Sequence, residues 1–204
     1  MPISGRKPSV PQDPDQVDGA VGGRSAGGAL IVGYGNPLRT DDGVGPAVAE
    51  LLAADPRLRG ADVRAEHQLT PELAIDASRV ALLVLVDAMV GVAAGEVVVR
   101  DLGVPGPSAA TETGPAGRGE GGGLPLTHHI GPASLLALAA ELWGSAPRTV
   151  LVGVGPASLA LGDTLTPAVA AAVPRAVDAV VAAVSVGIGA ASSGSARADS
   201  RRQG

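Results

Sequence analysis

Short apolar runs alternate with stretches of helical periodicity along most of the chain, and this alternation limits the fold more than any other feature. Residues 80–87, VALLVLVD, are apolar until the last position, as in a strand that is buried on both faces. Shorter runs predict further strands at 29–35, 61–67, 95–102 and 148–155. The stretches between them predict helices at 42–54, 71–78, 132–143 and 166–184. The order predicts a three-layer αβα fold, with a mostly parallel twisted sheet of about five strands flanked by helices.

The composition requires an aliphatic core and excludes several kinds of chemistry. Of the 204 residues 46% are hydrophobic but only 1% are aromatic, so Ala, Val and Leu must fill the sheet. A net charge of -5 argues against nucleic acid as a partner. The chain has no cysteine, which rules out disulfides, cysteine-type zinc sites, iron–sulfur clusters and a cysteine nucleophile.

Stretches rich in glycine, proline and small polar residues set the expected domain limits. Residues 1–27 and 187–204 show no periodicity, so we expect disordered arms on either side of one domain at 28–186. Residues 103–123 are similar in composition and predict a flexible insertion within that domain. The first arm lacks the apolar segment of a signal peptide, and charges, Gly or Pro interrupt every long apolar run. We therefore expect a cytoplasmic protein without membrane contact.

The segment GYGNPLRTDDGVG, residues 33–45, places Asp41 and Asp42 side by side between a predicted strand and a predicted helix. Capping explains one of them, because acidic groups are stabilised at a helix N-terminus. A cap needs one side chain, which leaves Asp42 for another role. A dinucleotide-binding loop is disfavoured, because Leu38 stands where the third glycine belongs and carboxylates oppose a pyrophosphate.

A third carboxylate and the three histidines also fall at predicted strand ends or loops. Asp87 ends the most apolar strand, at the edge where open α/β sheets bind ligands. A carboxylate at the end of a buried strand costs free energy unless it is paired with another group or binds a cation. His128 and His129 precede the helix at 132–143. His67 ends another strand, where a structural role fits it better than a direct one.

Asp42, Asp87 and one of the two adjacent histidines come from three loops at one edge of the sheet. Two carboxylates and an imidazole suit a borderline divalent metal ion with open coordination positions. The sequence lacks the G-x-S-x-G motif, so a Ser-His-Asp hydrolase is not supported.

Residues 29–184 resemble the [NiFe]-hydrogenase maturation proteases, the endopeptidases that trim the hydrogenase large subunit. Four segments carry the resemblance: GYGNPLRTDDGVGPAVAELL, LLVLVDAM, LTHHIGPASLLALA and TVLVGVGPASLALGDTLTPAVAAAVPRAV. The resemblance implies that Asp42, Asp87 and His128 are the catalytic and nickel-binding residues, with His128 matching the family better than its neighbour. The candidate accessory residues are Asn36, Asp41, His67 and His129.

The same resemblance implies a substrate and a reaction. The enzyme would remove the C-terminal extension of a [NiFe]-hydrogenase large-subunit precursor after nickel insertion, with the precursor's nickel as the recognition element. Hydrolysis has two open routes, a metal-polarised carbonyl attacked by metal-bound water, or a carboxylate acting as general base on water. Two alternatives stay open: a nickel-binding checkpoint protein that does not cleave, and a nucleotide-binding α/β module. We expect a monomer.

Overall fold

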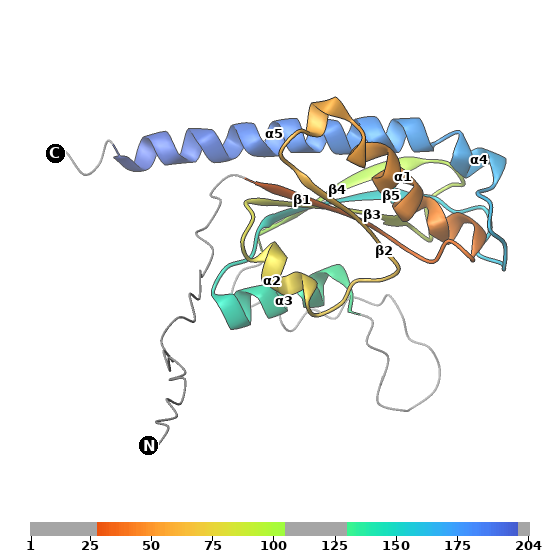
Figure 1. Ribbon diagram of the computed structural model, residues 1–204, viewed down its shortest axis with the longest axis horizontal. Helices are drawn as coiled ribbons and strands as arrows, with labels where there is room; N and C mark the ends of the chain where they lie inside the picture. Colours follow the sequence, from red (N-terminus) through yellow and green to blue (C-terminus); the bar gives the residue numbers. More distant parts are fainter. Residues whose placement is uncertain (1–27, 105–129, 200–204) are drawn as a thin grey trace, which may run out of the picture.

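The computed structural model describes residues 28–104 and 130–199, and these contain one five-stranded sheet with the strand order β2-β1-β3-β5-β4 (Figure 1). The strands are β1 (Ala29–Tyr34), β2 (Asp62–Glu66), β3 (Leu82–Ala88), β4 (Val97–Gly103) and β5 (Arg148–Val154). Strands β1, β2, β3 and β5 run parallel, and β4 pairs with β5 in the antiparallel direction at one edge. The predicted mostly parallel sheet is confirmed.

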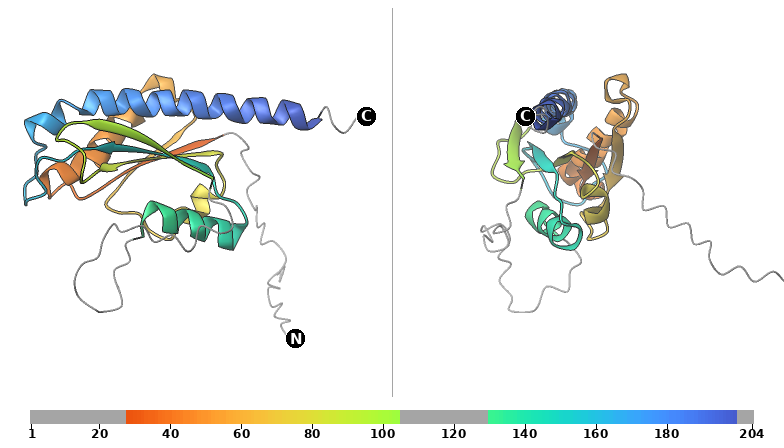
Figure 2. Two further views of the ribbon diagram at one scale, coloured as in Figure 1. Left: turned by 180° about the vertical axis from the view of Figure 1, so that it is seen from behind. Right: turned by 90° about the vertical axis from the view of Figure 1, so that its left-hand side faces the viewer.

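Helices cover both faces of this sheet, which confirms the three-layer prediction (Figures 1 and 2). The helical elements are η1 (Thr40–Gly43), α1 (Val44–Ala53), η2 (Pro56–Leu58), α2 (Leu73–Ala77), α3 (Pro132–Trp143), α4 (Pro167–Ala170) and α5 (Val173–Asp199). Helices α1 and α5 pack on one face, and α2 and α3 pack together on the other. Two separate apolar clusters therefore hold the sheet from its two sides.

Strands β1 and β3 are apolar over most of their length because both of their faces are buried. Along β1, Ala29 and Ile31 belong to the cluster under α1 and α5, whereas Leu30 and Val32 belong to the cluster under α2 and α3. All side chains from Leu82 to Val86 of β3 are buried in the same alternating manner. Successive strand residues point to opposite faces, so this burial explains the uninterrupted apolar runs.

The helix predicted at 166–184 is divided into two helices close to Pro174. Helix α4 ends at Ala170 and α5 begins at Val173, so the proline occupies the first turn of the second helix. Helix α5 then continues to Asp199, past residue 186 where we expected the domain to end. Extending an existing helix avoids the cost of nucleation, which gives a physical reason for this difference.

The span Pro167–Gly187 is long and apolar enough to cross a membrane by length and composition alone. Its packing gives another reason for that composition. Val173, Val177, Val180 and Val184 lie in the apolar cluster that covers the sheet. The apolar stripe of α5 is therefore part of the core of this domain.

Candidate active site

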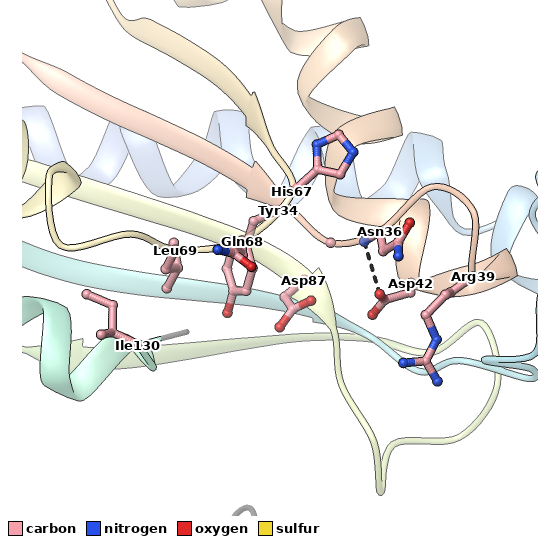
Figure 3. Close-up of a pocket in the computed structure, with 10 residues that line it drawn as sticks. Tyr34, Asn36, Arg39, Asp42, His67, Gln68, Leu69, Asp87 and Ile130 are labelled. Atoms are coloured by element: carbon pink, nitrogen blue, oxygen red, sulfur yellow. Dashed lines mark hydrogen bonds between the residues drawn. The ribbon is translucent and has the colours of Figure 1, made fainter. Parts of the chain in front are cut away.

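A pocket of about 480 Å³ lies at the carboxyl ends of β1 and β3. The η1 turn supplies Asp42 and the end of β3 supplies Asp87, and Figure 3 shows both carboxylates directed to the same side. The other lining residues are Tyr34, Gly35, Asn36, Arg39, His67, Gln68, Leu69 and Ile130. The structure thus brings together the two carboxylates that the sequence suggested.

A tight turn after β1 positions Asp42. Gly35 has φ of +140°, and a Cβ placed there would lie 1.9 Å from the carbonyl oxygen of Asp42. Only glycine permits this approach of the turn to the strand end. The backbone N–H of Asn36 then donates to Oδ2 of Asp42 over 3.0 Å, and its side-chain oxygen accepts from the N–H of Leu38. Asn36 therefore acts through its backbone on Asp42 and through its side chain on the turn.

Asp87 has an altered proton affinity in this pocket. Burial raises the pKa of Asp87 to about 7, and the nearby charge of Asp42 acts in the same direction. Hydrogen bonds from the Tyr34 hydroxyl and the Ala88 N–H oppose the rise in this pKa without cancelling it. Burial and the neighbouring Asp87 also raise the pKa of Tyr34, so the phenol keeps its proton. A carboxyl group that titrates near neutral pH suits general acid–base chemistry.

Asp41 does not line the pocket. It is fully buried and accepts hydrogen bonds from the N–H groups of Ala157 (2.8 Å), Ser158 (2.9 Å) and Thr166 (2.7 Å) and from the Thr166 hydroxyl (3.0 Å). Burial alone would raise the pKa of Asp41, but these hydrogen bonds outweigh burial and lower it. Asp41 therefore ties the η1 turn to the loop between β5 and α4.

The helix-capping role that we expected of one of the two aspartates is wrong. Neither η1 nor α1 has a side-chain cap hydrogen bond. Asp41 uses its two oxygens on a distant loop, and Asp42 uses Oδ2 on the preceding turn. The two acidic groups in the first turn of η1 thus hold neighbouring segments rather than the helix itself.

The histidines stand differently with respect to the two carboxylates. His67 lines the pocket but is exposed, and Figure 3 shows its ring directed away from Asp42 and Asp87. Within residues 28–104 and 130–199, no three His, Asp or Glu side chains come together as a metal site. His128 and His129 lie outside the described residues, so the histidine assignment rests on the sequence.

Sequence reasoning missed three polar residues of the pocket, namely Tyr34, Arg39 and Gln68. Two of them could have been predicted as site residues from their positions in the sequence. Tyr34 ends β1 beside the strand that carries Asp87, and Arg39 belongs to the same short segment as Asp42. Gln68 follows His67 in a loop, where the sequence has no periodicity that would indicate the direction in which a side chain points.

Comparison with solved structures finds hydrogenase maturation endopeptidases. The chain is 26% identical to the hydrogenase maturating endopeptidase HybD from E. coli, with a TM-score of 0.57 over 76% of this chain and 91% of HybD. It is 27% identical to a hydrogenase 2 maturation peptidase from a Thaumarchaeota archaeon, with a TM-score of 0.57 over 77% of this chain and 97% of that peptidase.

A further similar structure is the [NiFe] hydrogenase maturation protease HycI from Thermococcus kodakarensis. It is 22% identical, with a TM-score of 0.56 over 78% of this chain and 93% of HycI, and it bears on the fold alone. Comparison of the sequence with family models and with curated proteins finds no match.

Proposed function

Because the chain belongs to the [NiFe]-hydrogenase maturation proteases and is a peptidase, we propose that it removes the C-terminal extension of a hydrogenase large-subunit precursor. In this proposal the cut follows nickel insertion, and the nickel of the precursor is the recognition element. The metal is then part of the substrate, which arrives with the precursor and leaves with the product. We also propose that the enzyme acts as a monomer in the cytoplasm.

The juxtaposition of Asp42 and Asp87 in one pocket is the observation that supports this proposal most. Two carboxylates at the carboxyl edge of a parallel sheet offer oxygen ligands to a divalent cation. We assign the third ligand to His128. Ile130, the second residue after it in the chain, lines the same pocket, and consecutive Cα atoms are only about 3.8 Å apart.

The residues of the pocket suit peptide hydrolysis. Hydrolysis needs a group that takes a proton from water and a source of a proton for the leaving amine. Asp87 changes its protonation state near neutral pH because burial raises its pKa to about 7. Asp42 is held in the pocket by the N–H of Asn36, which donates to its Oδ2. In the alternative, metal-assisted route the two carboxylates would hold the nickel of the precursor, and this ion would polarise the peptide carbonyl.

The turn that carries Asp42 argues against a nucleotide-binding role. A phosphate would need free backbone N–H groups after β1. The N–H of Asn36 already donates to Asp42, and the N–H of Gly35 donates to the carbonyl oxygen of Glu66. The first turn of η1 adds two carboxylates where a phosphate would bind.

Mass spectrometry of the precursor tests the proposal. The full-length protein is incubated with nickel-loaded large-subunit precursor and, in parallel, with precursor from nickel-starved cells. We expect loss of the extension only from the loaded precursor, and no cleavage by Asp42→Ala, Asp87→Ala or His128→Ala. Asp163→Ala is the matched control, because Asp163 is exposed and does not line the pocket.

Three results would contradict parts of this proposal. Unchanged mass of loaded precursor with the wild-type protein would leave a checkpoint protein that binds without cleaving. Efficient cutting of unloaded precursor would remove nickel as the recognition element. Wild-type cleavage rates in a folded Asp42→Ala or Asp87→Ala variant would reject the carboxylate pair as the site of the reaction.

A further inference from the structure

Arg39 is the one Lys or Arg side chain among the described residues that line the carboxylate pocket. It is exposed and forms no ion pair within residues 28–104 and 130–199. Its Nε and Nη2 atoms both donate to the carbonyl oxygen of Leu159, each over 3.3 Å. A guanidinium carries five N–H donors, so three remain for a ligand.

The backbone under Arg39 is fixed by a second loop. The N–H and hydroxyl of Thr40 donate to the carbonyl oxygens of Gly162 (2.9 Å) and Ala160 (2.7 Å), and the N–H of Gly162 donates to that of Leu38 (3.1 Å). These bonds hold Thr40 at φ of 49°, a conformation that is unfavourable for a residue with a Cβ. The backbone that carries Arg39 is therefore fixed, and the two hydrogen bonds to the Leu159 carbonyl oxygen orient its guanidinium before a ligand binds.

The guanidinium lies beside the carboxylates without pairing with them. Figure 3 shows the side chain of Arg39 running from the η1 turn to the side toward which Asp42 and Asp87 point. Its recorded partner is the Leu159 carbonyl oxygen, on the opposite loop. The free donors of Arg39 are therefore available to a molecule that occupies the pocket.

The surroundings favour a neutral oxygen as the acceptor. Two carboxylates in the same pocket repel a free anion, whereas a peptide carbonyl carries no net charge. Outside the pocket lining, Leu38 and Leu161 lie on the two segments that frame Arg39 and are exposed by 63% and 89%, so both offer apolar contacts to a peptide substrate.

We propose that Arg39 binds a main-chain carbonyl oxygen of the precursor next to the carboxylate pair. This assignment rests on the proposed function and adds a substrate-binding residue to it. The carboxylates hold the part of the precursor that carries the metal, and Arg39 holds the peptide chain. The loop after β5 takes part through Leu159, which orients the guanidinium.

Steady-state cleavage and direct binding together test this role. Arg39→Gln removes the charge and the fork, Arg39→Lys keeps the charge alone, and Arg59→Gln is the control at an exposed arginine outside the pocket. Charge-assisted hydrogen bonds of this kind are worth about a tenfold to hundredfold change in affinity. We expect Arg39→Gln to raise KM and the Kd for uncut nickel-loaded precursor by about that factor, with kcat and the thermal midpoint close to wild type.

The outcomes separate this role from the proposed function. Arg39→Lys should recover part of the affinity, and Arg59→Gln should match the wild type. Equal Kd values for wild type and Arg39→Gln overturn the assignment, whether or not the wild type cuts. If the wild type binds but does not cut while Arg39→Gln binds weakly, the proposed function fails and the Arg39 assignment stands. A salt dependence of Kd that disappears in Arg39→Gln would indicate a carboxylate partner and overturn the carbonyl assignment.

Discussion

Replacing Asp41 with alanine should destabilise the protein far more than the same change at its neighbour Asp42. Asp41→Ala leaves the N–H groups of Ala157, Ser158 and Thr166 without their acceptor. Each buried donor that loses its partner costs about 1–3 kcal/mol. Water can reach part of this loop, because Ala157 is exposed and Thr166 half-buried, so we expect a total of about 3–5 kcal/mol.

Asp42→Ala should change the free energy of unfolding by less than about 1 kcal/mol, because the side chain accepts one hydrogen bond in a partly exposed position. Urea denaturation followed by far-UV circular dichroism measures both variants. With a slope of about 2 kcal/mol per molar urea, Asp41→Ala should lower the midpoint by about 2 M. A loss below about 1 kcal/mol for Asp41→Ala, or equal losses for the two variants, would refute the anchoring role.

The pH dependence of the stability lost in Asp41→Ala provides a second test of the anchoring role of Asp41. Hydrogen bonds lower the pKa of Asp41 despite its burial, so the ionised form stabilises the fold at pH values above the ordinary carboxyl pKa. That stability is lost as the pH falls through the lowered pKa. The gap between wild type and Asp41→Ala should therefore narrow below about pH 4. A gap of constant size down to pH 2 would contradict an ionised Asp41 in the folded protein.

Three further predictions concern the pocket. Burial raises the pKa of Asp87 from 3.8 to about 7, so Asp87→Asn should raise the free energy of unfolding at pH 8 by up to about 4 kcal/mol; urea titrations should show this gain shrinking as the pH falls below 7 and vanishing below about pH 4, where the carboxyl of the unfolded chain becomes protonated as well. Gly35→Ala should displace Asp42 and abolish cleavage, whereas Gly60→Ala, with positive φ but open space, should cost about 1 kcal/mol and leave precursor cleavage unchanged. His128→Ala should block precursor cleavage and His129→Ala only slow it, because adjacent side chains of extended chain point apart; the reverse order would move the ligand by one residue.

The parts of the fold that the sequence predicted correctly depend on local pattern. The runs at β1 and β3 are apolar at each buried position, so burial on both faces follows directly from composition. The antiparallel direction of β4 was not predicted, because an apolar run indicates a strand but not whether the strand runs parallel or antiparallel to its neighbour. The chain from Ala88 to Val97 contains no helix. Parallel strands need a long crossover, so this short connection was itself a signal for an antiparallel edge.

The parts of the site that the sequence did not predict depend on contacts between distant segments. Asp41 bonds with residues that lie 116, 117 and 125 positions away in the chain. Arg39 reaches a carbonyl oxygen 120 positions away. Rules of helix capping and charge patterning consider only residues close in sequence, so they cannot predict hydrogen-bond partners at such distances along the chain. Helix capping was the local explanation for one aspartate of the pair, whereas Asp41 in fact accepts hydrogen bonds from a distant loop.

The adjacent residues Asp41 and Asp42 have different roles, although one short turn carries both: Asp41 stabilises the fold and Asp42 lines the pocket. Consecutive side chains on the tight η1 turn leave it in different directions, so Asp41 enters the loop after β5 while Asp42 enters the pocket. The loop that Asp41 holds also supplies the Leu159 carbonyl oxygen that orients Arg39. Loss of Asp41 should therefore loosen the guanidinium as well as the fold. In a stabilised background that keeps Asp41→Ala folded, KM for the precursor should still rise, and an unchanged KM would separate the anchor from the binding site.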